Sequence, residues 1–244
     1  MDLITSTNDY LDGISCFGPL SIYAAGENAY KHQYIVLENK RVNLSELNIR
    51  DMDGGIDCVG GCFVYIKNSV VEGVGKAMLV GNEDLKFPGY VVLENCILQN
   101  NCRRCPEAQY GYGVYMFRCM VRNWGKGDRF DVRAFGAWAH SDGFIFAQNC
   151  VFWQDTFSNG HLWEDLKNHA GQAWNDRSLN PLDYITPGMC RGLTAGPGGK
   201  VVASNCWKNH PWIRIEGHKG PYMPTEDAYK LIAELEQLLH VEGT

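Results

Sequence analysis

One short pattern recurs along the chain, and Val91-Val92-Leu93-Glu94-Asn95-Cys96 shows it most clearly, with apolar residues leading into an Asn-Cys pair. Five further segments share the pattern: residues 42–47, 64–69, 114–119, 145–150 and 201–206. The intervals between their last residues (47, 69, 96, 119, 150 and 206) are 22, 27, 23, 31 and 56 residues. A β-rich unit repeated every 20 to 30 residues or so is typical of a solenoid.

The repeat predicts an all-β fold, a parallel β-helix in which each coil supplies three short strands. Equivalent residues would then stack on one another from coil to coil. An inward ladder is expected from Ser69, Cys96, Cys119, Cys150 and Cys206. A ladder of side-chain amides in a turn is expected from Asn68, Asn95, Asn149 and Asn205. The alternative is a sandwich of unrelated strands, which would leave the regular spacing of the Asn-Cys pairs unexplained.

The remaining segments fit a single domain over residues 1–244. Residues 224–240 are predicted to form a C-terminal helix packed on the β-helix, with Thr225 as N-cap and acidic residues in the first turn. Its apolar residues recur at helical spacing: Tyr229, Ile232, Leu235 and Leu239. Residues 154–190 have no clear period and are expected to form a long loop or mini-subdomain.

Charge and hydropathy exclude some classes of function. The 244 residues include 22 Lys and Arg against 28 Asp and Glu, a net charge of -6. Nonspecific binding to nucleic acids or anionic membranes requires a basic surface, so neither is an expected partner. No apolar run approaches the ~20 residues that span a bilayer. The first residues, Met1-Asp2-Leu3-Ile4-Thr5-Ser6, lack the basic and apolar regions of a signal peptide.

Three successive segments together resemble the core of the family 1 pectate lyases. They are Asp53-Gly54-Gly55-Ile56-Asp57-Cys58, the strand 64–69, and the stretch 75–84 that begins Gly75-Lys76 and contains Leu79-Val80-Gly81. Further along, Val91 to Asn100 looks like the strand and Asn-rich turn of the family, and Arg104-Cys105-Pro106 looks like its Arg-x-Pro motif. Residues 225–229 are similar to the start of a C-terminal helix found in some members. The resemblance is detailed over residues 42–124.

This resemblance implies a right-handed parallel β-helix that acts as a secreted, monomeric lyase and cleaves an acidic polysaccharide, polygalacturonate, by β-elimination. In that reaction Ca²⁺ stabilises charge on the substrate carboxylate while a base removes the neighbouring C5 proton. The matching metal ligands are Asp53 and Asp57, with Asp12 as a ligand from the preceding coil. Lys76 matches the lysine that binds the substrate carboxylate and assists catalysis, and Arg104 matches the catalytic base.

Two further residues are expected to bind substrate. Gln109 stands where the family has a second Arg, five residues after the first, and can hydrogen-bond a sugar but cannot neutralise a carboxylate. Arg133 follows one coil later and could line the same groove, or pair with Asp131. A second departure is Asn43-Leu44-Ser45-Glu46, which replaces the Trp-Ile-Asp-His segment of the family.

These departures keep two other functions open. A glycoside hydrolase on the same scaffold would need paired carboxylates, which Asp51, Asp53 and Asp57 could supply. A non-catalytic β-helix could instead bind carbohydrate, as in an adhesin or tailspike.

Other motifs give weaker signals. Two cysteine pairs, Cys58 with Cys62 and Cys102 with Cys105, fit local disulfides or free thiols better than a zinc site, because no His lies at the required spacing. His140 and Asp142 in Ala-His-Ser-Asp-Gly suggest a triad, but a His and an Asp on one turn are weak evidence.

Overall fold

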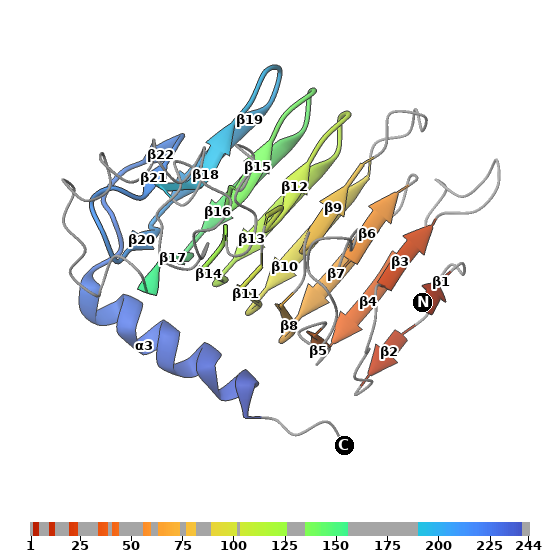
Figure 1. Cartoon of the computed structure of the whole chain (residues 1–244), viewed down its shortest axis with the longest axis horizontal. Helices are drawn as coiled ribbons and strands as arrows, with labels where there is room; N and C mark the ends of the chain where they lie inside the picture. Colours follow the sequence, from red (N-terminus) through yellow and green to blue (C-terminus); the bar gives the residue numbers. More distant parts are fainter. Residues whose placement is uncertain are drawn as a thin grey trace, which may run out of the picture.

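The computed structural model describes residues 2–4, 10–12, 20–23, 34–38, 41–43, 56–59, 63–73, 77–81, 89–101, 103–125, 135–155 and 190–240. The described chain is mostly β, with three parallel sheets and one C-terminal helix (Figure 1).

The first sheet has the order β1 (Asp2–Ile4), β3 (Leu20–Tyr23), β6 (Ile56–Val59), β9 (Met78–Val80), β12 (Glu107–Ala108), β15 (Ala137–Ala139), β18 (Arg191–Ala195) and β21 (Arg214–Ile215). The second has the order β2 (Tyr10–Asp12), β4 (Tyr34–Glu38), β7 (Phe63–Lys67), β10 (Tyr90–Glu94), β13 (Gly113–Phe117), β16 (Phe144–Gln148), β19 (Lys200–Ser204) and β22 (His218–Lys219). The third contains β5 (Arg41–Asn43), β8 (Val70–Glu72), β11 (Ile97–Gln99), β14 (Met120–Arg122), β17 (Val151–Trp153) and β20 (Trp207–Lys208).

The chain visits these sheets in strict rotation. From β3 onward each strand in the first sheet is followed by one in the second and, up to β20, one in the third. Every pairing between the described strands is parallel, so unrelated strands of an antiparallel sandwich do not account for the fold. The predicted parallel stacking is confirmed, and the arrangement is consistent with the predicted β-helix.

Alternate side chains of the strands point into a common apolar core. The second sheet contributes Val64, Val91, Val114 and Ile145, and the third contributes Val71, Leu98, Val121 and Phe152. Because paired strands keep the same register, each inward residue stacks on its counterpart from the next strand. This repetition explains why the hydrophobic pattern of one coil recurs in the next.

The inward ladder of thiols is confirmed. Cys96, Cys119, Cys150 and Cys206 are buried at equivalent positions before the strands of the third sheet, in line with buried Ser69. Each thiol lies 3.4–3.5 Å from a carbonyl oxygen in the strand of the second sheet that belongs to the previous coil. Burial and neighbouring thiols raise the pKa of Cys119 well above its ordinary value. These side chains are part of the apolar core, as predicted.

The ladder of turn asparagines is also confirmed, with one substitution. Asn68, Asn95, Asn149 and Asn205 all have φ between 46° and 55°, in the left-handed region that Asn tolerates. Stacked amides bond in pairs, Asn95 to Asn68 at 3.4 Å and Asn205 to Asn149 at 2.7 Å. Arg118 occupies the remaining position at φ 52°, and its Nε donates to Asn95 Oδ1 at 3.0 Å.

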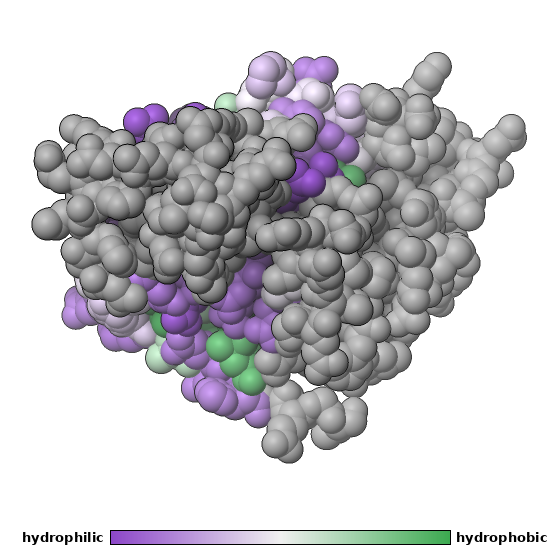
Figure 2. Space-filling model, in the orientation of Figure 1, coloured by the Kyte–Doolittle hydropathy of each residue, from purple (hydrophilic) through white to green (hydrophobic). Residues whose placement is uncertain are grey.

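The predicted C-terminal helix is α3 (Thr225–Glu236), followed by the short 3₁₀ helix η3 (Gln237–Leu239). It packs on the outer side of the third sheet, against Val70, Ile97, Met120 and Val151 (Figure 1). Its buried residues are Ala228, Leu231, Ile232 and Leu235. The surface over this part of the molecule is mostly hydrophilic, with a small hydrophobic patch (Figure 2).

Two details of the helix prediction are wrong. Pro224, not Thr225, is the N-cap residue, because the helix begins one residue earlier than the acidic motif suggests. Tyr229 is 52% exposed rather than part of the buried face, because the apolar stripe is centred on Leu231 and Ile232. The ring of Tyr229 instead contacts Trp153 and Trp207 at the edge of the sheet.

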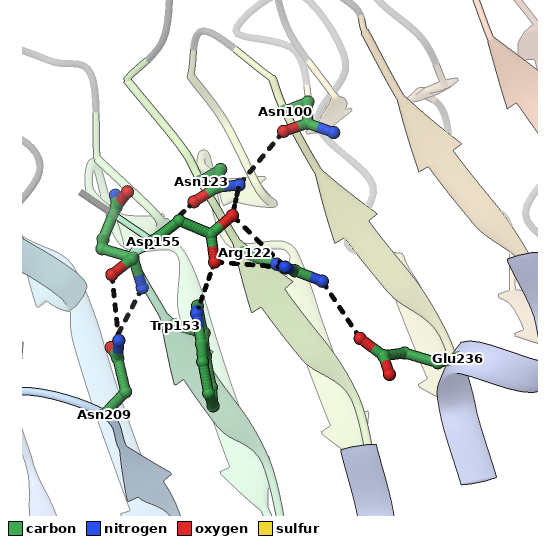
Figure 3. A network of polar contacts seen from close by, with 8 residues as sticks. Asn100, Arg122, Asn123, Trp153, Asp155, Asn209 and Glu236 are labelled. Atoms are coloured by element: carbon green, nitrogen blue, oxygen red, sulfur yellow. Dashed lines mark hydrogen bonds and ion pairs between the residues drawn. The ribbon is translucent and has the colours of Figure 1, made fainter. Parts of the chain in front are cut away.

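A polar network joins the end of this helix to the third sheet (Figure 3). Arg122 bridges Asp155 and Glu236, both at 3.1 Å. Asp155 also accepts hydrogen bonds from the Asn123 amide and the Trp153 indole, both at 2.6 Å. Partial burial alone would raise the pKa of Asp155, but the Asn123 amide and the Arg122 guanidinium outweigh it and lower that pKa.

The network should therefore contribute stability that depends on pH. A carboxyl group whose pKa is lowered by folding stabilises the folded state above its unfolded pKa, and that stability is lost as the pH falls through the folded value. We expect the wild-type melting temperature to decrease once the pH is lowered past about 4, which is the ordinary pKa of Asp. Asp155→Asn should lower the melting temperature at pH 7 and flatten this acid dependence. The exposed Asp227→Asn is the control, and an equal effect of both substitutions would contradict the prediction.

Candidate functional site

A group of polar side chains lies on the outer face of the first sheet. In this sheet Met78, Val80, Ala108 and Ala139 point into the core. The residues between them point outward and stack in register, with Leu79 paired to Glu107 and Glu107 paired to Trp138. The outer face of the first sheet is therefore the surface on which the site is built.

Glu107 is the centre of this group. Its Oε2 lies 2.5 Å from Nε of Arg104, and its Oε1 lies 2.8 Å from Nε2 of His140. The Glu107 side chain is only 3% exposed, against 20% for Arg104 and 16% for His140. A carboxylate this deeply buried needs compensation, which the guanidinium and the imidazole provide. We call Arg104, Glu107, His140 and Ser141 the Glu107 cluster.

The imidazole of His140 is held on all sides. Its Nδ1 lies 2.9 Å from Oγ of Ser141, so both ring nitrogens have polar partners. The Trp138 ring stacks on it, with centroids 4.1 Å apart and an interplanar angle of 26°. Tyr110 approaches edge-on at 6.5 Å and is itself 39% exposed. These contacts fix the orientation of the ring, which is what a catalytic acid or base requires.

The turn after β15 explains why His140 and Ser141 lie where they do. Ser141 and Asp142 have φ of 47° and 65°, so the chain reverses tightly, and Gly143 N–H bonds back to the His140 carbonyl at 2.8 Å. Ser141 N–H donates to Pro197, and its carbonyl accepts from Tyr110 N–H. Backbone bonds to the turns on either side thus hold this turn in place.

The structure brings two of the sequence-predicted residues to this face. Arg104 is part of the Glu107 cluster, with its guanidinium paired to Glu107 rather than isolated. Gln109 lies two residues after Glu107, directly after the end of β12, and its amide donates to the Gly81 carbonyl at 2.9 Å.

For the other predicted residues the structure gives at most the position of the backbone strand. Lys76, Arg133 and Asp53 lie outside the described residues. Asp57 is in β6 of the first sheet, where it pairs with Leu79 and so shares the register of Glu107. Asp12 ends β2 of the second sheet and pairs with Glu38, so it belongs to a different sheet from Asp57.

The described residues give no direct support to the predicted calcium site, of which Asp53 lies outside them. They contain no group of three or more His, Cys, Asp or Glu side chains that could hold a metal ion. Calcium binding therefore stays a prediction from the family resemblance. Of the two cysteine pairs, Cys62 and Cys102 lie outside the described residues, while Cys105 is buried.

Sequence reasoning missed the central residue of the site. Glu107 follows Arg104 at a spacing of three, and this acid–base spacing is the sequence feature that could have indicated Glu107. The sequence suggests a pairing of His140 with Asp142, whereas the hydrogen-bonding partners of its ring are Glu107 and Ser141.

Comparisons with protein-family models, curated proteins and solved structures found no match to this chain. Among the residues that the structure describes, no helix is long and apolar enough to cross a membrane.

Proposed function

We propose that the protein is a polysaccharide lyase that cleaves a uronate-containing polysaccharide, such as polygalacturonate, by β-elimination at the Glu107 cluster. The observation that carries this proposal is the buried Glu107 carboxylate, shared between the Arg104 guanidinium and the His140 imidazole. A buried acid, a fixed imidazole and a guanidinium on one sheet face are suited to proton transfer beside an anionic substrate.

The finer fold proposal is a right-handed parallel β-helix. It is supported by the strict rotation of the chain through three parallel sheets and by the thiol and asparagine ladders. Connections between parallel strands are overwhelmingly right-handed. On such a scaffold the outer face of the first sheet is a long surface that can accommodate several sugar units of a polymer.

In the proposed reaction His140, Glu107 and Arg104 each have a separate role. His140 accepts the C5 proton at Nδ1 once the Ser141 hydroxyl rotates away. The C4–O bond then breaks, a C4–C5 double bond forms, and the leaving oxygen takes a proton from water. Glu107 orients the imidazole through Nε2, as the carboxylate does in other His-based sites. Arg104, which stays protonated, offers positive charge to the substrate carboxylate, and His140 serves as the base in place of the Arg104 predicted from the sequence.

The proposal leaves calcium as a separate question. Asp53 and Asp57 remain the predicted ligands, and no step above passes through the ion. A chelator that abolishes turnover, with recovery on adding Ca²⁺, would support the calcium prediction.

The test is an assay with polygalacturonate, following the ultraviolet absorbance of the unsaturated product. His140→Ala is expected to lower kcat/KM by about 10²- to 10⁴-fold, the usual contribution of a general base. His240→Ala, an exposed residue after η3, is the control and should retain activity.

Other outcomes would select other functions. Undiminished turnover in His140→Ala would contradict the assignment. Reducing sugar released without the ultraviolet signal would indicate a hydrolase, and glycan binding without turnover would indicate a carbohydrate-binding protein.

A further inference from the structure

Three side chains of the Glu107 cluster form a continuous line of hydrogen-bonding groups. Ser141 Oγ lies 2.9 Å from His140 Nδ1, and His140 Nε2 lies 2.8 Å from Glu107 Oε1. This is the order of groups in a nucleophile–base–orienter triad: a hydroxyl, an imidazole and a buried carboxylate. A β-elimination needs the imidazole but has no use for a hydroxyl in line with it.

The chemistry of the Glu107 side chain determines which groups donate and which accept in the hydrogen bonds among Ser141, His140 and Glu107. Oε2 of Glu107 faces the Arg104 guanidinium, and Oε1 faces the His140 imidazole. A carboxylate only accepts hydrogen bonds, so Nε2 of His140 carries the hydrogen between them. In the neutral imidazole Nδ1 is then an acceptor, and the Ser141 hydroxyl is its donor. The hydroxyl proton therefore points at a base that is ready to receive it.

The backbone at Ser141 has the strain expected of a nucleophile on a tight turn. Its φ of 47° is unusual for a residue other than Gly, Asn or Asp, and such strain is concentrated at functional sites. A Cβ atom at Gly198 would lie 3.2 Å from the Asp142 amide nitrogen and 3.6 Å from Ser141 Cα. Glycine at position 198 thus keeps space beside the amide that directly follows Ser141. In many serine hydrolases the amide after the nucleophile stabilises the oxyanion.

We propose that Ser141 is the nucleophile of an esterase activity that removes short acyl groups from sugar hydroxyls. Ser141 Oγ attacks the ester carbonyl while its proton passes to His140 Nδ1. The sugar oxygen leaves with that proton, and an acyl group remains on Ser141. Water then attacks the acyl group, His140 takes the water proton and returns it to Oγ, and the carboxylic acid is released. Only the choice of a glycan ester rests on the proposed lyase function.

The experiment uses two probes that do not depend on the natural substrate. A fluorophosphonate should label Ser141, identified by mass spectrometry of the intact protein and its peptides. Hydrolysis of p-nitrophenyl acetate should fall at least about 100-fold in Ser141→Gly, because the nucleophile is lost. Glycine tolerates the positive φ, so this variant keeps the turn, whereas Ser141→Ala would add backbone strain. Ser204→Ala, on the second sheet, is the matched control and should keep both signals.

The outcomes separate this inference from the proposed function. Labelling at Ser141 that disappears in His140→Ala supports the esterase, whether or not polygalacturonate yields an unsaturated product. An unlabelled Ser141, under conditions that label a known serine hydrolase, overturns it even if lyase activity is present. Undiminished hydrolysis of p-nitrophenyl acetate by Ser141→Gly also overturns it.

Discussion

Glu107→Ala should abolish measurable turnover of polygalacturonate and lower the free energy of unfolding by about 3 kcal/mol. Both effects come from the same removal of charge. Arg104 and His140 are largely buried, and Glu107 is the carboxylate that both of them contact. Without it the guanidinium loses its compensating charge and the imidazole loses the group that fixes its orientation. Denaturant unfolding and the ultraviolet assay measure the two effects separately.

Glu107→Gln separates orientation from packing. The amide has the volume of the carboxyl group but no negative charge, so we expect most of the activity to be lost with a smaller loss of stability. Glu226→Gln, an exposed residue in the first turn of α3, is the control and should change neither. A Glu107→Gln protein with full activity would show that the carboxylate does not act on His140, and it would remove the basis of the proposed mechanism.

The ladders could be predicted from the sequence because each depends on a local pattern. An Asn in the left-handed turn and a Cys directly after it recur together, and parallel stacking follows once these pairs are aligned. Arg118 shows the limit of this reasoning. An arginine does not indicate a left-handed turn, yet Arg118 adopts φ 52° because the neighbouring turns impose the same geometry. Tertiary context here overrides the local preference for Asn.

The site could be predicted only in part, because its contacts join residues far apart in the sequence. Glu107 and His140 are 33 residues apart, and their contact depends on the register between β12 and β15. β12 has only two residues, so no alternating pattern shows which of its side chains faces outward. Arg104 and Gln109 were found through a family motif, and that motif does not reveal that Glu107 lies between them as the partner of the arginine.

The thiol ladder gives the second large prediction. Cys119 lies in the middle of the ladder, is fully buried, and has its Sγ 3.4 Å from the carbonyl oxygen of Leu93. Cys119→Asp would place a carboxyl group among neighbouring thiols and carbonyl oxygens, with no cation to compensate it. We expect the free energy of unfolding to fall by at least about 4 kcal/mol at pH 7, enough to unfold much of the protein.

Cys119→Ser is the matched control, since Ser69 occupies the equivalent position two strands earlier in the third sheet and donates to the Lys67 carbonyl at 2.7 Å. A hydroxyl therefore fits the ladder, and this variant should lose far less stability than the aspartate variant.

The aspartate variant should also respond to pH. Burial raises the pKa of the introduced carboxyl group, so its destabilising effect grows as the pH rises above the ordinary pKa of Asp and is smaller at pH 5 than at pH 7. Denaturant unfolding at pH 7 and pH 5 tests both points. Equal stability of the two variants would mean that position 119 is accessible to water, which is incompatible with a stacked interior at this position.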